Sequence, residues 1–228
     1  MTHPYPANTL GRCARWLARL WQDRSAVAYL EFAYAFPAVS LMGLYGVEAT
    51  NLALTNMRIS QIALTVADNS SRVGQDSSLS LVQFRESDVN DSFMAAKLQA
   101  GKLNLTTQGR LILSSLQQNE DGGQWIAWQR CVGLKHYDST YGEEGDGETG
   151  TSFPGMGQPG QELKAPAGNA VMFVEVTYDY EPIVSSTLFG QPRLHYTASF
   201  VVRDQRDLTQ IYNPSPAAAV ANCNQYTL

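Results

Sequence analysis

Histidine is the side chain most often used as a general acid or base near neutral pH. The chain has three histidines, His3, His136 and His195. No H-E-x-x-H or G-x-S-x-G sequence lies near His136 or His195, so neither the zinc-hydrolase nor the serine-hydrolase pattern is present. Two scattered histidines without such a motif are typical of ordinary surface residues. The sequence offers no catalytic residue, and we expect no enzymatic activity.

A glycine- and acid-rich segment spans residues 138–160, and its letters GDGETG at 145–150 match the G-x-G-x-x-G pattern of dinucleotide sites. Such a site needs a strand before it, a helix after it and amides free to meet phosphate. Here four acidic side chains crowd the motif and Pro154 follows. The same acids lack EF-hand spacing for calcium. We therefore expect an exposed acidic loop at 138–160, with no cofactor and no metal.

Three cysteines, Cys13, Cys131 and Cys223, are spaced far apart. Cys13 lies before the apolar segment described next and the other two lie after it. On the oxidising side of a membrane, Cys131 and Cys223 would form an even pair. We expect a disulfide that ties the C-terminal tail to the sheet, with two buried free thiols as the alternative.

Glu31 is the only charged residue in an apolar run from Ser25 to Val47. A membrane-spanning helix needs about twenty such residues. A charge within a span is costly and is by default functional. Pro37 would kink the helix, which membrane helices tolerate. Either Glu31 has a specific partner, or it extends to the interface and has no specific role.

Residues 1–25 form a basic leader with four arginines and one aspartate, a net charge of +3. The whole chain carries −5, so the remainder carries −8, and this acidic balance argues against nucleic acid as a partner. The positive-inside rule places the leader in the cytoplasm and the later residues outside it. A cleaved secretory signal is disfavoured because its apolar region is only about 7–15 residues long.

Helical periodicity continues beyond the span at 26–47. No Gly or Pro interrupts Val47–Arg72, so we expect this segment to continue the helix of the span. The second half of this single helix is amphipathic and has an apolar stripe. The stripe consists of Leu52, Ile59, Ile62 and Val66, and the polar side includes Asn51, Asn56, Arg58 and Gln61. Asp88–Leu98 reads as a second, short helix.

The period then changes to two, which indicates strands. We expect them over Arg110–Leu116, Gln124–Cys131, Val171–Tyr180 and Leu194–Val202. In the third strand, Glu175, Thr177 and Asp179 fall on the polar side. One apolar face suggests an antiparallel sheet covered on that face by the long helix. The prediction is an α+β, single-pass membrane protein, and a long half-membrane helix on an antiparallel sheet resembles the plan of a type IV pilin, so the expected fold is pilin-like.

The string AVAYLEFAYAFPAVSLMGLYGVEATNLALTNMRISQIALTVADNSSRVG, Ala26–Gly74, resembles the N-terminal region of TadE-like proteins. These are pseudopilins and assembly proteins of the bacterial tight-adherence (Tad or Flp, type IVb) pilus. The segments at Trp128–Cys131, Met172–Ser185 and Val202–Asn213 look similar to longer members of this family, so the resemblance covers most of the chain.

The resemblance implies that a prepilin peptidase could cut between Ala26 and Val27. The family usually has Gly where this chain has Ala26, which leaves two outcomes, processing or permanent anchoring. If the leader is removed, the new α-amino group of Val27 would be a cation at the depth of Glu31. Pairing of Glu31 with that amine, in the same or a neighbouring subunit, would then neutralise both charges and fix axial register.

The resemblance further implies a structural role as a minor pilin, pseudopilin or assembly component of an adhesion pilus. Residues 48–228 would form a periplasmic domain on an inner-membrane anchor. A chain incorporated into the pilus would lie in the extracellular fibre instead. The expected partners are other pilins, Tad assembly proteins, the peptidase and membrane lipid. The alternative is a membrane-tethered periplasmic binding or sensor module that enters no fibre.

Overall fold

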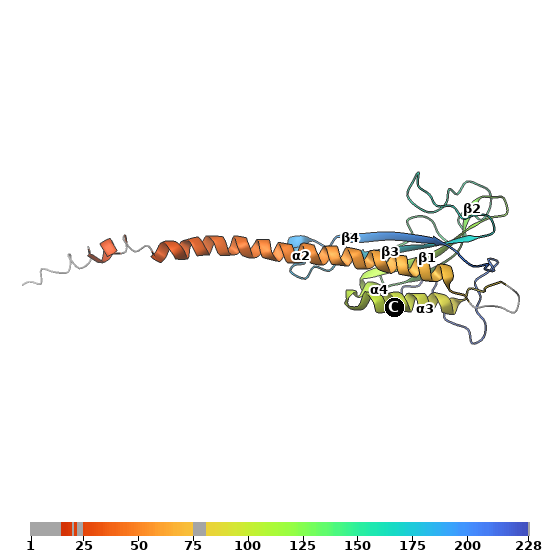
Figure 1. The fold of residues 1–228 in the computed structure, drawn as a ribbon, viewed down its shortest axis with the longest axis horizontal. Helices are drawn as coiled ribbons and strands as arrows, with labels where there is room; N and C mark the ends of the chain where they lie inside the picture. The colour runs from red at the N-terminus through yellow and green to blue at the C-terminus, as the bar shows by residue number, and fades with distance from the viewer. Residues whose placement is uncertain (1–14, 20, 22–24, 75–80, 228) are drawn as a thin grey trace, which may run out of the picture. The chain divides into compact units, whose positions relative to one another are not determined.

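The structure is a computed structural model that describes residues 15–19, 21, 25–74 and 81–227. Most of the basic leader and Cys13 lie outside these residues. The chain divides into two compact units, residues 1–49 and 50–228, which are described separately below. The first unit contributes the beginning of helix α2, and the second contains the sheet (Figure 1).

Helix α2 runs from Ser25 to Arg72 without a break, which confirms the predicted long helix. Pro37 lies inside it. The last carbonyls of a helix have no intrahelical donors, and Arg206 donates to two carbonyls at this end of α2. Arg206 Nη1 donates to the Ser70 carbonyl at 2.9 Å and Nη2 to the Val73 carbonyl at 2.6 Å. A buried cation therefore lies at the negative end of the helix dipole.

The second unit is built on one antiparallel sheet with the strand order β2-β1-β3-β4. Its strands are β1 (Gly109–Gln118), β2 (Gln124–Val132), β3 (Ala170–Asp179) and β4 (Arg193–Val201). All three pairings are antiparallel. The four expected strands and the α+β class are thus confirmed, with ends that differ by at most two residues.

One face of the sheet is covered by helices. Ile59, Ile62 and Val66 of α2 are fully buried in the main core, which also contains Val89 and Phe93 of helix α3 (Glu86–Ala100). Strand residues of alternate positions complete this core. The predicted apolar stripe of α2 is therefore the side that packs on the sheet.

Two asparagines on the predicted polar side of α2 also contact the sheet. Asn51 Nδ2 donates to the Tyr180 hydroxyl at 2.6 Å. The Tyr196 hydroxyl donates to Asn56 Oδ1 at 3.0 Å. Each tyrosine keeps its ring in the core and its hydroxyl at the edge of the helix–sheet contact, where a polar partner is needed. Polarity alone therefore did not identify the solvent side of the helix.

The other face of the sheet is covered as well, which the one-sided expectation did not include. A second cluster combines strand residues with Met156 and Ala165 from the long connection between β2 and β3. Tyr141 and Phe153 pack against it. Most residues of 138–160 are exposed, but Gly155 and Met156 are buried. Short apolar anchors in a glycine-rich segment have no periodicity, so the pattern did not reveal them.

Candidate functional site

The first candidate site is the surface of α2 within the first unit. Its large apolar side chains from Val27 to Val47 are 44–79% exposed. Among the described residues, one helix is long and apolar enough to cross a membrane; the stretch that qualifies, Val27–Arg72, includes this segment. Exposed apolar surface of this extent needs a non-aqueous environment or a partner. This region is the candidate membrane span.

Glu31 lies on the exposed surface of this apolar segment. Within the described part of the chain, no cation is paired with it. Helix α2 begins at Ser25, so the Ala26–Val27 bond lies in its first turn. Five residues of helix separate Ala26 from Glu31, about 7.5 Å along the axis. Any partner for Glu31 would therefore lie outside the described residues.

Helix α2 also carries an exposed apolar stripe within the second unit. Leu54, Met57 and Leu64 are 51%, 58% and 47% exposed. Spacings of three and seven residues place them on one side of a helix. They alternate with the buried stripe that packs on the sheet. The helix thus presents one apolar side to its own core and another outward.

The second candidate site lies where the C-terminal tail meets strand β2. Cys131 and Cys223 form the predicted disulfide. Beside it, the Cys131 amide donates to the Ala221 carbonyl at 2.8 Å and the Gly133 amide to the Thr227 carbonyl at 2.9 Å. The tail therefore covers the outer edge of β2, an edge that would otherwise expose unpaired backbone groups.

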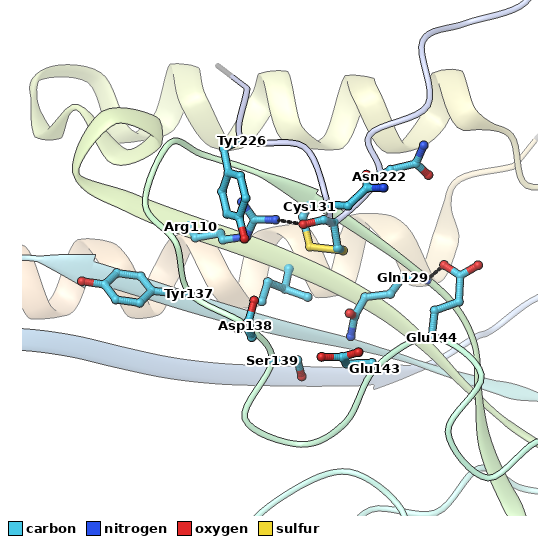
Figure 2. A pocket seen from close by; sticks show the side chains of 13 residues that line it. Arg110, Gln129, Cys131, Tyr137, Asp138, Ser139, Glu143, Glu144, Asn222 and Tyr226 are labelled. Carbon is cyan, nitrogen blue, oxygen red and sulfur yellow. Dashed lines mark hydrogen bonds between the residues drawn. A yellow bond between two sulfur atoms is a disulfide. The ribbon is translucent and has the colours of Figure 1, made fainter.

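Arg110 is the central side chain beneath the tail, and it is 1% exposed. Its guanidinium donates to the carbonyls of Gly133, Gln225 and Cys223. The Tyr226 ring lies over it, with its centroid 4.2 Å from Arg110 Cζ (Figure 2). Burial lowers the pKa of Arg110, but a guanidinium stays charged at physiological pH. Carbonyl dipoles and a ring face thus stabilise a buried cation.

A cavity of about 590 Å³ opens beside this arrangement. Arg110 and the disulfide form one side, and the acids Asp138, Glu143 and Glu144 line the other (Figure 2). Among the described residues, none that lines the cavity is a histidine. His136 stacks on Tyr226 at 3.7 Å, and His195 Nδ1 is 3.0 Å from Thr177 Oγ1. Its polar groups could hydrogen-bond a small polar molecule or a basic group.

The glycine-rich motif at 145–150 lies in a loop attached to strand β2. The Ile126 amide donates to the Asp146 carbonyl, and the Gly145 amide donates to the Ile126 carbonyl, both at 2.9 Å. These bonds occupy the backbone at the point where the β1–β2 register shifts. Across the described residues, no cluster of three His, Cys, Asp or Glu side chains is arranged to hold a metal ion.

Glu175 lies on the loop-covered face of the sheet, on the predicted polar side of β3, but it is buried there. It is 1% exposed. The Ser139 hydroxyl and the Thr140 amide donate to its carboxylate. Burial nevertheless raises the pKa of Glu175, and its effect exceeds the opposing effect of the hydrogen bonds from Ser139 and Thr140.

A buried ion pair, which the sequence pattern did not suggest, lies on the helix-covered side. Arg130 Nη2 is 2.6 Å from Glu86 Oε1, and Arg130 Nη1 is 3.1 Å from Glu144 Oε2. The side chains of Glu86 and Arg130 are 3% and 8% exposed. Glu86 opens α3, and its amide donates to the Tyr212 carbonyl of the tail. The only sequence signal was a charged residue inside the apolar strand WIAWQRC.

Comparisons of this chain with protein-family models, with curated proteins and with solved structures gave no match.

Proposed function

We propose that this chain is a minor pilin, pseudopilin or assembly component of a Tad-type pilus. In this proposal, residues 26–47 anchor it in the inner membrane and residues 48–228 lie in the periplasm. The observation that carries the proposal is the single helix Ser25–Arg72, whose first half is apolar and exposed and whose second half packs on an antiparallel sheet. This arrangement is the one that the TadE-like resemblance implies.

Two further observations support the proposal. The disulfide Cys131–Cys223 suits a domain in an oxidising compartment. The outward stripe of Leu54, Met57 and Leu64 continues the apolar character of α2 beyond the span. A helix with a second apolar side suits packing against helices of neighbouring subunits.

A second candidate function is a tethered binding module that enters no fibre. The polar cavity beside Arg110 favours it, because the acids and amides of its lining could bind a ligand. In that case the helix would be only an anchor, and the leader would stay attached.

Mass spectrometry of the intact protein from its native membrane tests the pilin route. On the pilin route we expect a mature chain that begins at Val27. The proposed pairing with Glu31 needs the α-amino group that removal of the leader creates. An Ala26→Gly variant provides the matched control, since it restores the residue usual in the family. A chain that keeps its leader, while the Ala26→Gly variant is cut, favours the tethered module.

A further inference from the structure

The loop between β3 and β4 is an exposed apolar element of the second unit. Its central residues 182–191 read PIVSSTLFGQ and contain no charged side chain. Ile183 is 65% exposed and Leu188 is 67% exposed. The loop includes the short helix α5 (Ser186–Phe189), whose N-cap Ser185 accepts a hydrogen bond from the Leu188 amide. Two large aliphatic side chains are therefore held outward on a defined loop.

The loop lies at the end of the sheet nearest to the start of the unit. The Tyr180 amide donates to the Pro192 carbonyl at 3.0 Å and closes the base of the loop. The Tyr180 hydroxyl in turn accepts from Asn51 of α2. The base of the loop is thus level with the second residue of the unit.

Two more contacts fix the direction of α2 along the sheet. Asn56 pairs with Tyr196, and Asp68 accepts a hydrogen bond from Arg203 at 3.2 Å. Residue numbers along α2 and along β4 therefore increase in the same direction. It follows that the loop before β4 lies at the end of the sheet where residues 50–228 begin, beside Asn51.

The candidate span ends at Val47, four residues before Asn51, and α2 is continuous across them. Four residues of helix cover about 6 Å. Eleven residues separate Tyr180 from Pro192, so the loop tip can lie at most about 18 Å beyond its base. Chain connectivity alone therefore holds the loop within reach of the membrane surface.

The turns at the two ends of the sheet differ in composition. The β1–β2 turn at the opposite end, residues 119–123, reads NEDGG and has two acids and no apolar side chain. At the loop end, Asp179 is neutralised by Lys135 and Arg193 at 3.2 and 3.3 Å. Glu181 accepts a hydrogen bond from Gln108. The carboxylates at the base of the loop thus have partners.

We propose that the β3–β4 loop is a second membrane contact, in which Ile183 and Leu188 enter the lipid interface beside the span. This inference rests on the proposed membrane anchor but not on fibre assembly. Aliphatic side chains in the headgroup–acyl boundary bind by removing apolar area from water. The contact would hold the domain in one orientation on the membrane.

The test uses the full chain in phosphatidylethanolamine–phosphatidylglycerol nanodiscs, with Cys13→Ser so that one free thiol is labelled. A polarity-sensitive nitrobenzoxadiazole dye is placed at Thr187→Cys, beside Leu188. A matched label at Glu120→Cys reports on the opposite end of the sheet, and one at Val39→Cys reports on the span. Quenching by nitroxide-labelled lipids is measured at each position.

We expect quenching at Thr187→Cys to exceed that at Glu120→Cys several-fold and to be lost when Ile183→Ser and Leu188→Ser are added. Quenching at Val39→Cys with none at Thr187→Cys would overturn the loop contact and leave the span intact. Retained quenching in the double serine variant would also overturn it, because the aliphatic side chains would not be the contact. Absence of quenching at Val39→Cys would refute the anchor and this inference with it.

Discussion

Glu31 and Glu175 are carboxylates in apolar surroundings, but their situations differ. Glu175 has donors from its own chain, the Ser139 hydroxyl and the Thr140 amide. Glu31 lies on an exposed apolar helix surface, so a partner would come from outside the described residues. The role of Glu175 can be tested by measuring folding stability, whereas the role of Glu31 can be tested only by measuring assembly.

At the residue scale, Glu31→Ala should reduce pilus assembly by more than about tenfold, because it leaves the partner amine as an unpaired charge within the membrane. The measurement is the amount of fibre recovered by shearing, with membrane levels of the protein checked in parallel. Tyr29→Ala is the matched control, since it removes an exposed neighbour without changing charge. Normal assembly by Glu31→Ala would refute the pairing.

A second residue-scale prediction concerns the pH dependence of stability. The pKa of Glu175 is raised in the folded state by burial. The folded protein therefore holds this proton more tightly than the unfolded chain does. Its stabilising effect is full below the ordinary pKa of 4.5 and is lost as pH rises through the folded pKa.

Glu175→Gln should accordingly raise the free energy of unfolding by about 1–3 kcal/mol at neutral pH and have little effect in acid. Urea denaturation at about pH 4 and pH 7 measures this difference. Glu120→Gln in the exposed β1–β2 turn should change stability at neither pH. An equal effect of Glu175→Gln at both pH values would contradict the assigned cause.

At the element scale, the C-terminal tail works as a strap. The disulfide, the backbone bonds to β2 and the carbonyls around Arg110 all hold it in place. Gly133 takes part with φ 124°, and an added Cβ would lie 2.4 Å from the Gly109 carbonyl oxygen. A non-glycine residue there would displace the strand that positions Arg110.

Replacing both Cys131 and Cys223 by Ser should lower the free energy of unfolding by about 2–4 kcal/mol, because the closed loop no longer restricts the unfolded chain. Hydrogen exchange should also quicken at the Cys131-position and Gly133 amides, whose acceptors lie in the tail. Cys13→Ser serves as the control and should change neither quantity. Unchanged exchange at both amides would show that the tail stays bound without its covalent link.

Elements with a regular period could be predicted from the sequence, while contacts without one could not. The long helix and four strands follow from spacings of 3.6 and 2 in long apolar patterns. Arg110, Glu175 and Arg130 are buried charges whose stabilising partners lie in loops, in the tail or in α3, far along the chain. Nothing in a strand's own pattern distinguishes such a residue from a solvent-facing one.

The candidate site could be predicted only in part for the same reason. The apolar span, Glu31 and the cysteine pair were readable from composition and position. The cavity beside Arg110 could not be predicted, because it is formed by β1, β2, the long connection and the tail. Asn51 and Asn56 illustrate the limit at small scale, since their partners are tyrosines 129 and 140 residues away.

At the scale of the whole molecule, one helix carries an exposed apolar segment in its first half and packs on an antiparallel sheet with its second half. That design suits a subunit that leaves the membrane to enter a fibre, and it equally suits a stationary tethered module. The outward apolar stripe of α2 and the loop at 182–191 make different demands. In the proposals above, the stripe packs against neighbouring helices, whereas the loop enters lipid.

Quantitative mass spectrometry of fibres sheared from the native bacterium tests the central claim most directly. We predict that sheared Tad pili contain this chain in a low, fixed ratio to the major pilin and that the ratio survives further purification. A peptide that begins at Val27 should accompany it. Complete retention of the chain in the cell membrane, with none in pili that assemble normally, would contradict its incorporation into the fibre.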